Sequence, residues 1–347
     1  MDDKILARLA DVVGNAIPLF DNDKVKFSKP GYEAIPISKN NFKRINKINA
    51  DCRIAFVDGG NAEIIAAPNF SLQFIRIYAC VFKDNKKIDS VKKEFYLLVK
   101  SAVQKEVFYE TEIFPVTGNV KIEKSIFDSN DITLKEGSGR ADISKIGEIV
   151  RRFAELSAAA DIADTLNSGD ILVLDGSLQA NVSGESVFLD KLFEKGKQKN
   201  VVITGLAKTS RLFTDKGNSI LGLLNEIGPE NEWYYHPVAK ITNPNNRAEM
   251  LFVKLNKTAD HIFRFEVFNY KEDEINKIVS QLMDNAKDPV FPGYPYGLLV
   301  ADKFARVSNN EKEYIQTIIK SNAGKNWAKI KKYMNSFDAH SILDNIG

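Results

Sequence analysis

The chain has 347 residues, of which 44% are hydrophobic and 27% charged, so it can bury one large core or two smaller ones. This composition excludes an intrinsically disordered chain. Lys and Arg number 48 against 46 Asp and Glu, which gives a formal net charge of +2, so the total charge neither requires nor excludes a nucleic-acid partner. The longest apolar runs, such as Ile171–Leu174, are far shorter than the roughly 18 residues that cross a membrane. We expect a folded protein without a membrane segment.

The first twenty residues contain acids from the second position onward and lack both a basic start and a continuous apolar stretch. They differ from a secretory leader and predict an amphipathic helix in a cytoplasmic protein. Cys52, Cys80 and the histidines show none of the spacings typical of structural zinc sites or disulfide frameworks.

The organisation along the chain shows no internal repeat, low-complexity tract or Gly/Ser-rich linker, so we expect one elaborated domain over 1–347. Within it we predict an N-terminal helical region (1–50), a core (51–310) with an insertion at about 83–141, and a C-terminal helical region (311–347).

The first half of the core is predicted to be mainly β-structure. We expect strands at 52–57, 62–67, 73–82, 93–99 and 102–114. The first ends at a tight turn, Asp58-Gly59-Gly60, and Pro68-Asn69 marks another turn, so the first three strands suggest an antiparallel meander. The polar stretch 127–140 is predicted to be a loop.

The second half alternates helices and strands. Helical periodicity over 142–166 predicts a long helix packed on the sheet, and the buried strand Ile171–Leu174 follows it and ends in Asp175-Gly176. We further expect a helix at 186–195 and strands at 201–204, 250–255 and 261–268. The predicted class is mixed α/β.

Two buried strands each deliver an aspartate, Asp58 and Asp175. Open sheets bind ligands beyond the carboxyl ends of their strands, so neighbouring strands would bring both carboxylates to one edge. Paired carboxylates repel unless a cation lies between them, commonly Mg²⁺ or Mn²⁺. The alternative is that each Asp-Gly pair simply makes a turn.

Glu155 lies on the predicted helix before Asp175 and can face the same edge of the sheet. The alternative is an ordinary surface ion pair with Arg151 or Arg152. Glu148 lies on nearly the same helical face and is the competing candidate.

Four short blocks follow one another along the chain. They are Phe56-Val57-Asp58-Gly59-Gly60, Arg151-Arg152-Phe153-Ala154-Glu155, Leu174-Asp175-Gly176-Ser177-Leu178, and Pro292-Gly293-Tyr294-Pro295-Tyr296 followed by Ala301-Asp302. Together these blocks resemble the NurA nuclease family. The order and context of all four match the family, and the last block, leading into a helix, is the most distinctive. The resemblance covers the chain from about Arg53 to Val307.

The resemblance implies a ribonuclease H-like mixed sheet flanked by helices, with insertions, and a manganese-dependent DNA nuclease, with Mg²⁺ as the alternative ion. It also implies a homodimer that works with the hexameric HerA translocase, an ATPase, in double-strand break resection. The implied activity is a 5′–3′ exonuclease on single- and double-stranded DNA with endonuclease activity on single strands. The alternatives are a catalytically weak, DNA-guiding adaptor of the translocase and a ribonuclease of the same fold.

Position by position, the resemblance implies three metal ligands, Asp58, Glu155 and Asp175, and makes Tyr294 the late catalytic tyrosine. A histidine that some members carry eight residues later would fall on Asp302, so this chain departs from the family pattern there. An aspartate cannot supply an imidazole ligand, but its oxygen can bind Mn²⁺ or position water, so we include Asp302 in the catalytic set. The alternative for Asp302 is an i,i+4 salt bridge with Arg306.

Cationic and aromatic residues supply candidate DNA contacts. Lys208 and Arg211 follow the strand at 201–204 and can contact a phosphate, although a solvated loop is the alternative. Tyr294 can also stack on an unpaired strand. The segment 325–333 carries lysines and aromatics without an acid and can bind a DNA backbone or a partner, with a solvated amphipathic helix as the alternative.

Overall fold

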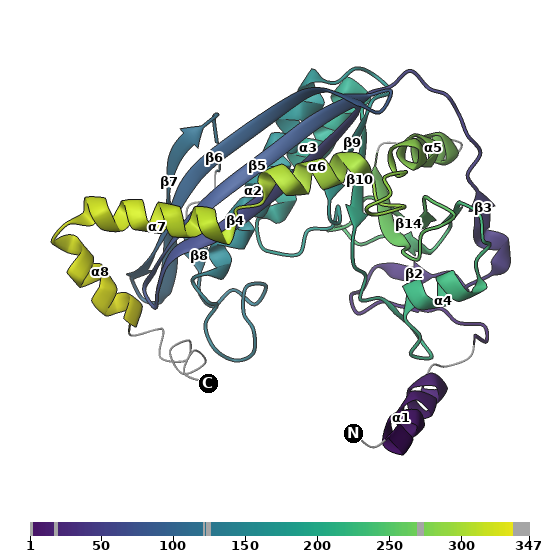
Figure 1. Ribbon diagram of the computed structural model, residues 1–347, viewed down its shortest axis with the longest axis horizontal. Coiled ribbons are helices and arrows are strands. Elements are labelled where there is room, and N and C mark those ends of the chain that lie inside the picture. The colour runs from purple at the N-terminus through teal and green to yellow at the C-terminus, as the bar shows by residue number, and fades with distance from the viewer. Residues whose placement is uncertain (1–2, 17–19, 121, 123–125, 269–273, 336–347) are drawn as a thin grey trace. The chain divides into compact units, whose positions relative to one another are not determined.

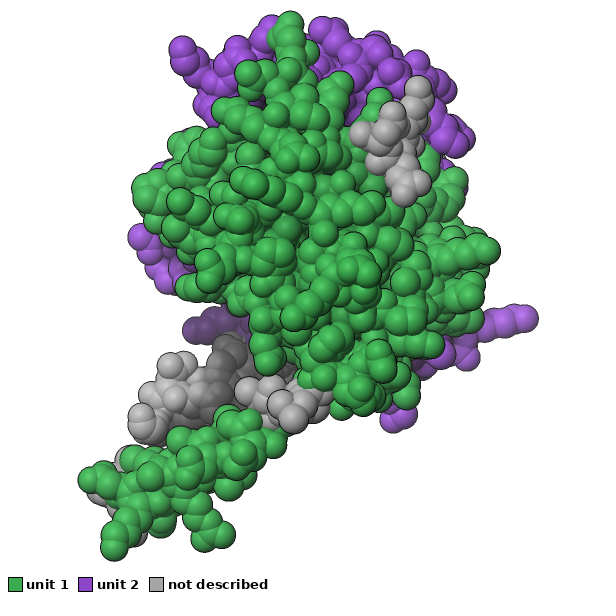
Figure 2. Space-filling model, turned by 90° about the vertical axis from the view of Figure 1, so that its right-hand side faces the viewer, with its two compact units in different colours: residues 1–51, 175–179, 204–296 green, residues 52–174, 180–203, 297–347 purple. Residues whose placement is uncertain are grey.

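The computed structural model describes residues 3–16, 20–120, 122, 126–268 and 274–335 (Figure 1). The chain forms two compact units, each assembled from segments that are distant in the sequence. The first contains residues 1–51, 175–179 and 204–296, and the second contains 52–174, 180–203 and 297–347 (Figure 2). The predicted single domain over 1–347 and its subdivision stay predictions. Within the described ranges, no helix combines the length and the apolar character needed to cross a membrane.

The second unit contains a meander of long antiparallel strands. They are β4 (Ile54–Ala67), β5 (Phe70–Lys83), β6 (Lys86–Val103), β7 (Val107–Thr117) and β8 (Ile126–Asp128), paired in that order. Their β-branched and aromatic residues suit a half-buried pleated surface. An antiparallel meander is present, but the three strands predicted for it at 52–57, 62–67 and 73–82 are two strands, β4 and β5. The segment 83–141 supplies β6, β7 and β8, which continue the meander.

The predicted tight turn at Asp58-Gly59-Gly60 is wrong. β4 runs through this tripeptide without a break, so the strands expected at 52–57 and 62–67 are one strand. The glycines allow close approach instead of a turn, since a Cβ on Gly59 would lie 2.6 Å from Oε1 of Glu155. The turn at Pro68-Asn69 is confirmed.

β9 (Ile171–Asp175) makes the sheet of this unit mixed, because it pairs in parallel with β4. The register places Ile54 opposite Ile171 and Val57 opposite Leu174. The strand ends at Asp175, directly before Gly176, whose φ of 111° lies in the region that side chains disfavour. Asp175 is therefore held at the carboxyl end of β9, as the sequence predicted.

Helices cover both faces of this sheet (Figure 1). On one face α2 (Lys145–Thr165) packs against β4, β5 and α3 (Glu185–Lys199), and on the other lie α6 (Tyr296–Ala305), α7 (Asn309–Ala323) and α8 (Asn326–Asn335). Adjacent residues of β5 show the two faces: Gln73 donates from Nε2 to the Ser144 carbonyl beside α2, at 2.6 Å, whereas Phe74 packs with Ile315 of α7. The predicted long helix is confirmed as α2.

The first unit contains an antiparallel sheet with strand order β3 (Phe42–Arg44), β12 (Trp233–Tyr235), β14 (Glu249–Lys254), β15 (Phe263–Phe268). Buried Trp233, Tyr235 and Phe252 form the centre of its core. Its other elements are α1 (Asp3–Asn15), β1 (Val25–Lys26), β2 (Tyr32–Ala34), the 3₁₀ helix η1 (Lys39–Asn41), β11 (Phe213–Thr214), α4 (Ile220–Ile227), β13 (Ala239–Ile241) and α5 (Ile275–Asn285). β10 (Val202–Ala207) begins in the second unit and ends in the first. The predicted N-terminal helix is confirmed as α1.

Candidate metal centre

The position of Asp58 follows from the alternation of side chains along β4. Phe56, Asp58 and Gly60 share one face of the strand because successive residues point to opposite faces. α6 lies directly on this face: a Cβ on Gly297 would overlap the ring of Phe56, and a Cβ on Gly60 would overlap the carbonyl oxygen of Ala305. These contacts lie near the two ends of α6 and on either side of Asp58 in β4. The helix that carries Asp302 is therefore held against the strand that carries Asp58.

Three acids form a cluster at this place. One carboxylate oxygen from each of Asp58, Asp175 and Asp302 lies within 4.8 Å of the other two. Asp58 is 8% exposed and the other two are partly exposed. Asp58 also accepts a hydrogen bond from the Gly59 N–H, at 2.7 Å, which fixes the orientation of its carboxylate. The predicted approach of Asp58 and Asp175 is thus present, and Asp302 joins them.

The donor set suits a hard divalent cation. Mg²⁺ prefers oxygen ligands at about 2.1 Å in octahedral geometry, so two ligands of one ion lie about 3 Å apart when adjacent and about 4.2 Å apart when opposite, and small side-chain rotations would bring the three oxygens into this range. Without a cation the carboxylates repel one another. The residues of the cluster therefore fit an ion of the Mg²⁺ or Mn²⁺ type.

Glu155 lies on the other side of β4, beside Gly59. It is 2% exposed, and its carboxylate accepts hydrogen bonds from Nη1 of Arg151 and, at 3.4 Å, from Nη1 of Arg152. Both arginine pairs that the sequence offered as an alternative are present, but they are partly buried rather than on the surface. The competing acid, Glu148, is exposed. Glu155 is not among the three clustered acids, and its role as a metal ligand stays a prediction.

Arg152 is itself shared between two acids, because its Nε donates to Oε1 of Glu185 at 3.0 Å. Burial lowers the pKa of Arg152, but the charges of Glu155 and Glu185 outweigh burial and raise this pKa above its ordinary value. The guanidinium therefore stays charged and lies between Glu155 and Glu185 on the α2 side of the sheet.

Lys208 is the nearest predicted DNA contact to the acids. It follows β10, and its Nζ lies 2.7 Å from Oδ2 of Asp175. The same nitrogen lies 5.4 Å from the centroid of the Tyr294 ring, a cation–π distance. An ammonium group in this place can neutralise Asp175 or donate to a phosphate oxygen. Arg211 lies three residues later and is exposed.

Tyr294 is fully buried rather than displayed to solvent. Its ring stacks on Phe291 with a centroid distance of 5.1 Å and lies 5.5 Å from Phe263. A ring enclosed in this way has no face for an unpaired base, so the contact it offers to the candidate site is the one with Lys208. The predicted catalytic role of Tyr294 stays a prediction. Tyr296, which opens α6, is 43% exposed.

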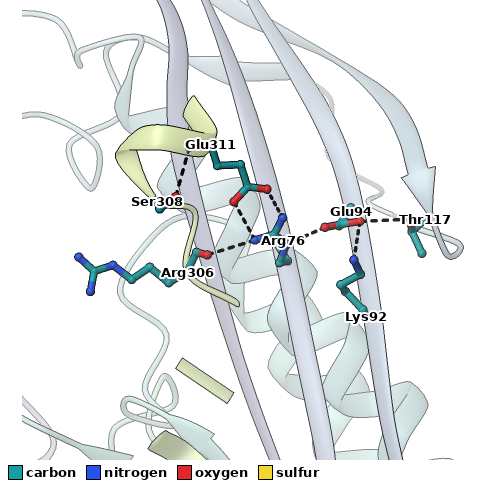
Figure 3. A network of polar contacts seen from close by, with 7 residues as sticks. All are labelled: Arg76, Lys92, Glu94, Thr117, Arg306, Ser308 and Glu311. Carbon is teal, nitrogen blue, oxygen red and sulfur yellow. Dashed lines mark hydrogen bonds and ion pairs between the residues drawn. The ribbon is translucent and has the colours of Figure 1, made fainter. Parts of the chain in front are cut away.

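Sequence reasoning missed Arg76, which lies on β5 opposite Gly60 (Figure 3). It donates to Oε1 of Glu94 at 2.6 Å and to Oε2 of Glu311 at 3.2 Å. It also donates to the Arg306 carbonyl at 3.1 Å, directly after α6. Arg76 therefore ties the end of the helix that carries Asp302 to the sheet. A single arginine within the apolar run of residues 73–82 was the available signal.

Comparison with solved structures finds similarity to nucleases. The crystal structure of the NurA nuclease from Sulfolobus solfataricus matches with a TM-score of 0.52 at 15% identity, over 83% of this chain and 89% of that chain. The catalytic domain of human endonuclease V matches with a TM-score of 0.39 at 8% identity, over 78% and 84% of the two chains. Endonuclease V from Ciona intestinalis, in complex with a DNA containing an inosine, matches with a TM-score of 0.39 at 12% identity, over 78% and 89%.

No family model and no curated protein sequence matches this chain. The structural match to the Sulfolobus solfataricus protein nevertheless covers most of both chains. The predicted fold class, a ribonuclease H-like mixed sheet flanked by helices, is confirmed. The resemblance seen in the four sequence blocks is therefore confirmed at the level of the fold: this chain has the fold of a NurA nuclease.

Proposed function

We propose that this chain is a metal-dependent phosphodiesterase that cleaves DNA. The observation that carries the proposal is the approach of Asp58, Asp175 and Asp302, whose carboxylate oxygens lie within 4.8 Å of one another. A fold similar to that of a solved nuclease supports the same reading. An adaptor that only guides DNA has no need for three mutually repelling acids at one place, so we favour an enzyme over the adaptor.

The proposed roles follow from the positions of the side chains. Asp58, Asp175 and Asp302 would hold Mn²⁺ or Mg²⁺, and Glu155 remains a predicted ligand on the far side of β4. A bound divalent ion neutralises charge on a phosphate and lowers the pKa of water for in-line attack. Lys208 would donate to a phosphate oxygen once its contact with Asp175 is released.

Lys208 is held for this role by its neighbours. Its ammonium lies over the ring of Tyr294, and the ring in turn is fixed by Phe291. We propose that Tyr294 acts by orienting Lys208, and that Arg211, further along the same loop, contacts the DNA backbone. Both lie in the first compact unit.

We extend the proposal to the biology that the four sequence blocks imply. The enzyme would be a 5′–3′ exonuclease, with endonuclease activity on single strands, that acts as a homodimer with a HerA-type hexameric translocase in DNA end resection. Light scattering should then report about twice the chain mass of 38.9 kDa. A monomer mass, with and without DNA, would count against the dimer.

A substrate panel tests the proposed activity. Single- and double-stranded DNA and RNA of one sequence, labelled separately at the 5′ and 3′ ends, would be incubated with EDTA, Mg²⁺ or Mn²⁺. We expect DNA cleavage with Mn²⁺ and none with EDTA, and the two labels report the polarity. Cleavage of RNA alone would favour a ribonuclease, and no cleavage of any substrate would overturn the proposal.

A further inference from the structure

The C-terminal helical hairpin carries an unusual concentration of positive charge. Residues 314–337 contain no Asp or Glu, although acids and bases are nearly balanced in the whole chain. The lysines in this stretch are Lys320, Lys325, Lys329, Lys331 and Lys332. All are exposed. The hairpin is therefore a local basic surface on a chain whose total charge is close to neutral.

α8 is amphipathic, and its apolar side is already occupied. Trp327, Ile330 and Met334 recur at spacings of three and four residues and pack on a cluster around Ile64, Ile65 and Phe74 in the second unit. The ring of Tyr333 adds a contact with Phe70, at a centroid distance of 6.4 Å. This packing fixes the rotation of α8 about its axis and turns the opposite side of the helix to solvent.

Three lysines form a stripe on that opposite side. Lys329 and Lys332 lie three residues apart on one face of α8, and Lys325, in the turn directly before α8, precedes Lys329 by four residues at the N-terminal end of this stripe. At 1.5 Å per residue the stripe is about 10 Å long. Phosphates along one strand of B-DNA rise about 3.4 Å each along the axis but also turn around it, so neighbouring phosphates lie about 7 Å apart and the stripe spans about two of them.

Among the described residues, no acid neutralises these lysines. Elsewhere lysines pair closely with acids, as Lys93 does with Asp161 at 2.6 Å. Among the residues that the structure describes, no carboxylate lies within 4.0 Å of Lys325, Lys329 or Lys332. The described part of the chain therefore does not balance their charge, which can attract an external anion.

The hairpin is tied to the sheet that carries Asp58. Ser308 caps α7 by accepting a hydrogen bond from the Glu311 N–H at 3.2 Å, and the Glu311 side chain is held by Arg76 (Figure 3). α7 and α8 both pack against β4. The lysine stripe is thus held in a fixed position in the same unit as Asp58 and Asp302.

We propose that the surface formed by Lys329 and Lys332 of α8, together with Lys325 directly before this helix, is a second DNA-binding surface, distinct from the acid cluster, that holds the phosphate backbone of the substrate. The proposal rests on the proposed nuclease function. Lysine ammonium groups act as point charges on phosphates and do not read bases, so binding there is independent of sequence. Binding releases counterions and therefore weakens steeply with salt.

The test compares two triple variants that lose the same charge. One is Lys325→Gln/Lys329→Gln/Lys332→Gln, and the control removes three exposed lysines of the first unit, Lys39→Gln/Lys240→Gln/Lys257→Gln. Affinity for a fluorescent 30-nucleotide DNA would be measured by anisotropy in EDTA at several salt concentrations. Circular dichroism would verify that both variants fold, and Lys329→Gln alone would be used if the triple variant did not.

We expect the α8 variant to lose about ten-fold or more in affinity at low salt, and its slope of log affinity against log salt to fall by about 2–3, since each phosphate contact contributes about 0.9. The control should keep the wild-type slope. Equal slopes in all three proteins, or equal losses in both variants, would overturn the proposal. A different result is that the α8 variant binds DNA as wild type does and yet is no longer retained on a polyglutamate resin, which mimics an acidic protein. That result would overturn the proposal and assign the lysine face to an acidic protein partner.

The EDTA condition separates this proposal from the nuclease assignment. Binding is measured without cleavage. If the wild-type protein binds DNA through α8 but cleaves no substrate, only the nuclease proposal is contradicted. If the wild-type protein cleaves DNA with Mn²⁺ and the α8 variant binds DNA as tightly as wild type, only the α8 proposal is contradicted.

Discussion

Gly60 of β4 and Ala305 of α6 meet backbone to backbone. A Cβ on Gly60 would overlap the Ala305 carbonyl oxygen, which is part of the main chain and cannot rotate away. This contact sets how closely the helix bearing Asp302 approaches the strand bearing Asp58. The spacing of two acids in the candidate metal centre therefore depends on the absence of a side chain at position 60.

Gly60→Ala should separate α6 from β4 and lower the free energy of unfolding by about 1–3 kcal/mol, as overpacking typically does. It should also weaken Mn²⁺ binding, measured as a smaller rise in melting temperature on adding the ion. Gly139→Ala is the matched control, because a Cβ there meets nothing within 4 Å. Equal stability of the two variants would show that the Gly60–Ala305 contact is loose.

Asp302→Asn should raise the Mn²⁺ concentration needed for half-maximal cleavage by about ten-fold or more, since even partners of metal ligands contribute that much. The variant should melt no lower than wild type without metal, because one of three repelling carboxylates has been neutralised. A cleavage titration that overlays the wild-type curve would remove Asp302 from the site and favour its pairing with Arg306.

Glu155→Gln should lose much more cleavage activity than Glu148→Gln if Glu155 is a ligand. It should also be less stable, because Arg152 is largely enclosed and would lose one of its two acids, at a cost of about 1–3 kcal/mol. Urea unfolding and cleavage assays on both variants separate these effects. If folded Glu155→Gln keeps full cleavage activity, Glu155 has a structural role only. If Glu148→Gln loses more activity than Glu155→Gln, Glu148 is the favoured ligand.

Arg76→Met should lower the free energy of unfolding at pH 7 by about 3 kcal/mol, because it leaves Glu94 and Glu311 without their shared cation. Burial raises the pKa of Glu94, but hydrogen bonds from Arg76 and Lys92 outweigh it and hold this pKa below its ordinary value of 4.5. The stabilisation is therefore complete above pH 4.5 and is lost as the pH falls through the lowered pKa.

Urea unfolding at several pH values checks the Arg76 prediction. The difference between wild type and Arg76→Met should stay constant from neutral pH down to about 5.5 and shrink below 4.5. Lys92→Met is the control, since Lys92 also pairs with Glu94 but is 47% exposed and should matter little. A difference that grows in acid would contradict the assigned role.

Lys208→Gln should have two opposite effects. Removing the ammonium 2.7 Å from Asp175 frees that carboxylate for a cation, so Mn²⁺ should bind more tightly by calorimetry. Cleavage should nevertheless slow, because a phosphate contact is lost. Arg211→Gln, on the same loop, should reduce DNA affinity without changing Mn²⁺ binding. Weaker Mn²⁺ binding in Lys208→Gln would contradict this role.

The sequence carried enough information to place Asp58 and Asp175 together, because each follows a run of buried apolar residues and the two runs pair in parallel. It misjudged Asp58-Gly59-Gly60, since an Asp-Gly-Gly run is typical of a turn. Here the glycines are required by α2 and α6 packing on opposite faces, a tertiary contact that local sequence does not reveal.

Local sequence also does not reveal on which face of the sheet each acid lies. Glu155 matched the family block, yet Gly59 rather than Asp58 points toward it. Asp302 lies on the face shared by Asp58 because small residues of α6, Gly297 among them, allow the helix onto β4. The ion pair of Arg76 could not be predicted from local sequence, because its partner Glu311 is 235 positions away.

The most direct test of the proposed metal-dependent nuclease is cleavage of labelled single-stranded DNA by wild type and Asp58→Asn, purified in parallel to control for contaminating nucleases. We expect wild type to cleave with Mn²⁺ and not with EDTA, and Asp58→Asn to lose about 100-fold or more while its circular dichroism spectrum is unchanged. Equal Mn²⁺-dependent rates in the two proteins would contradict the assignment of the acid cluster as the active site.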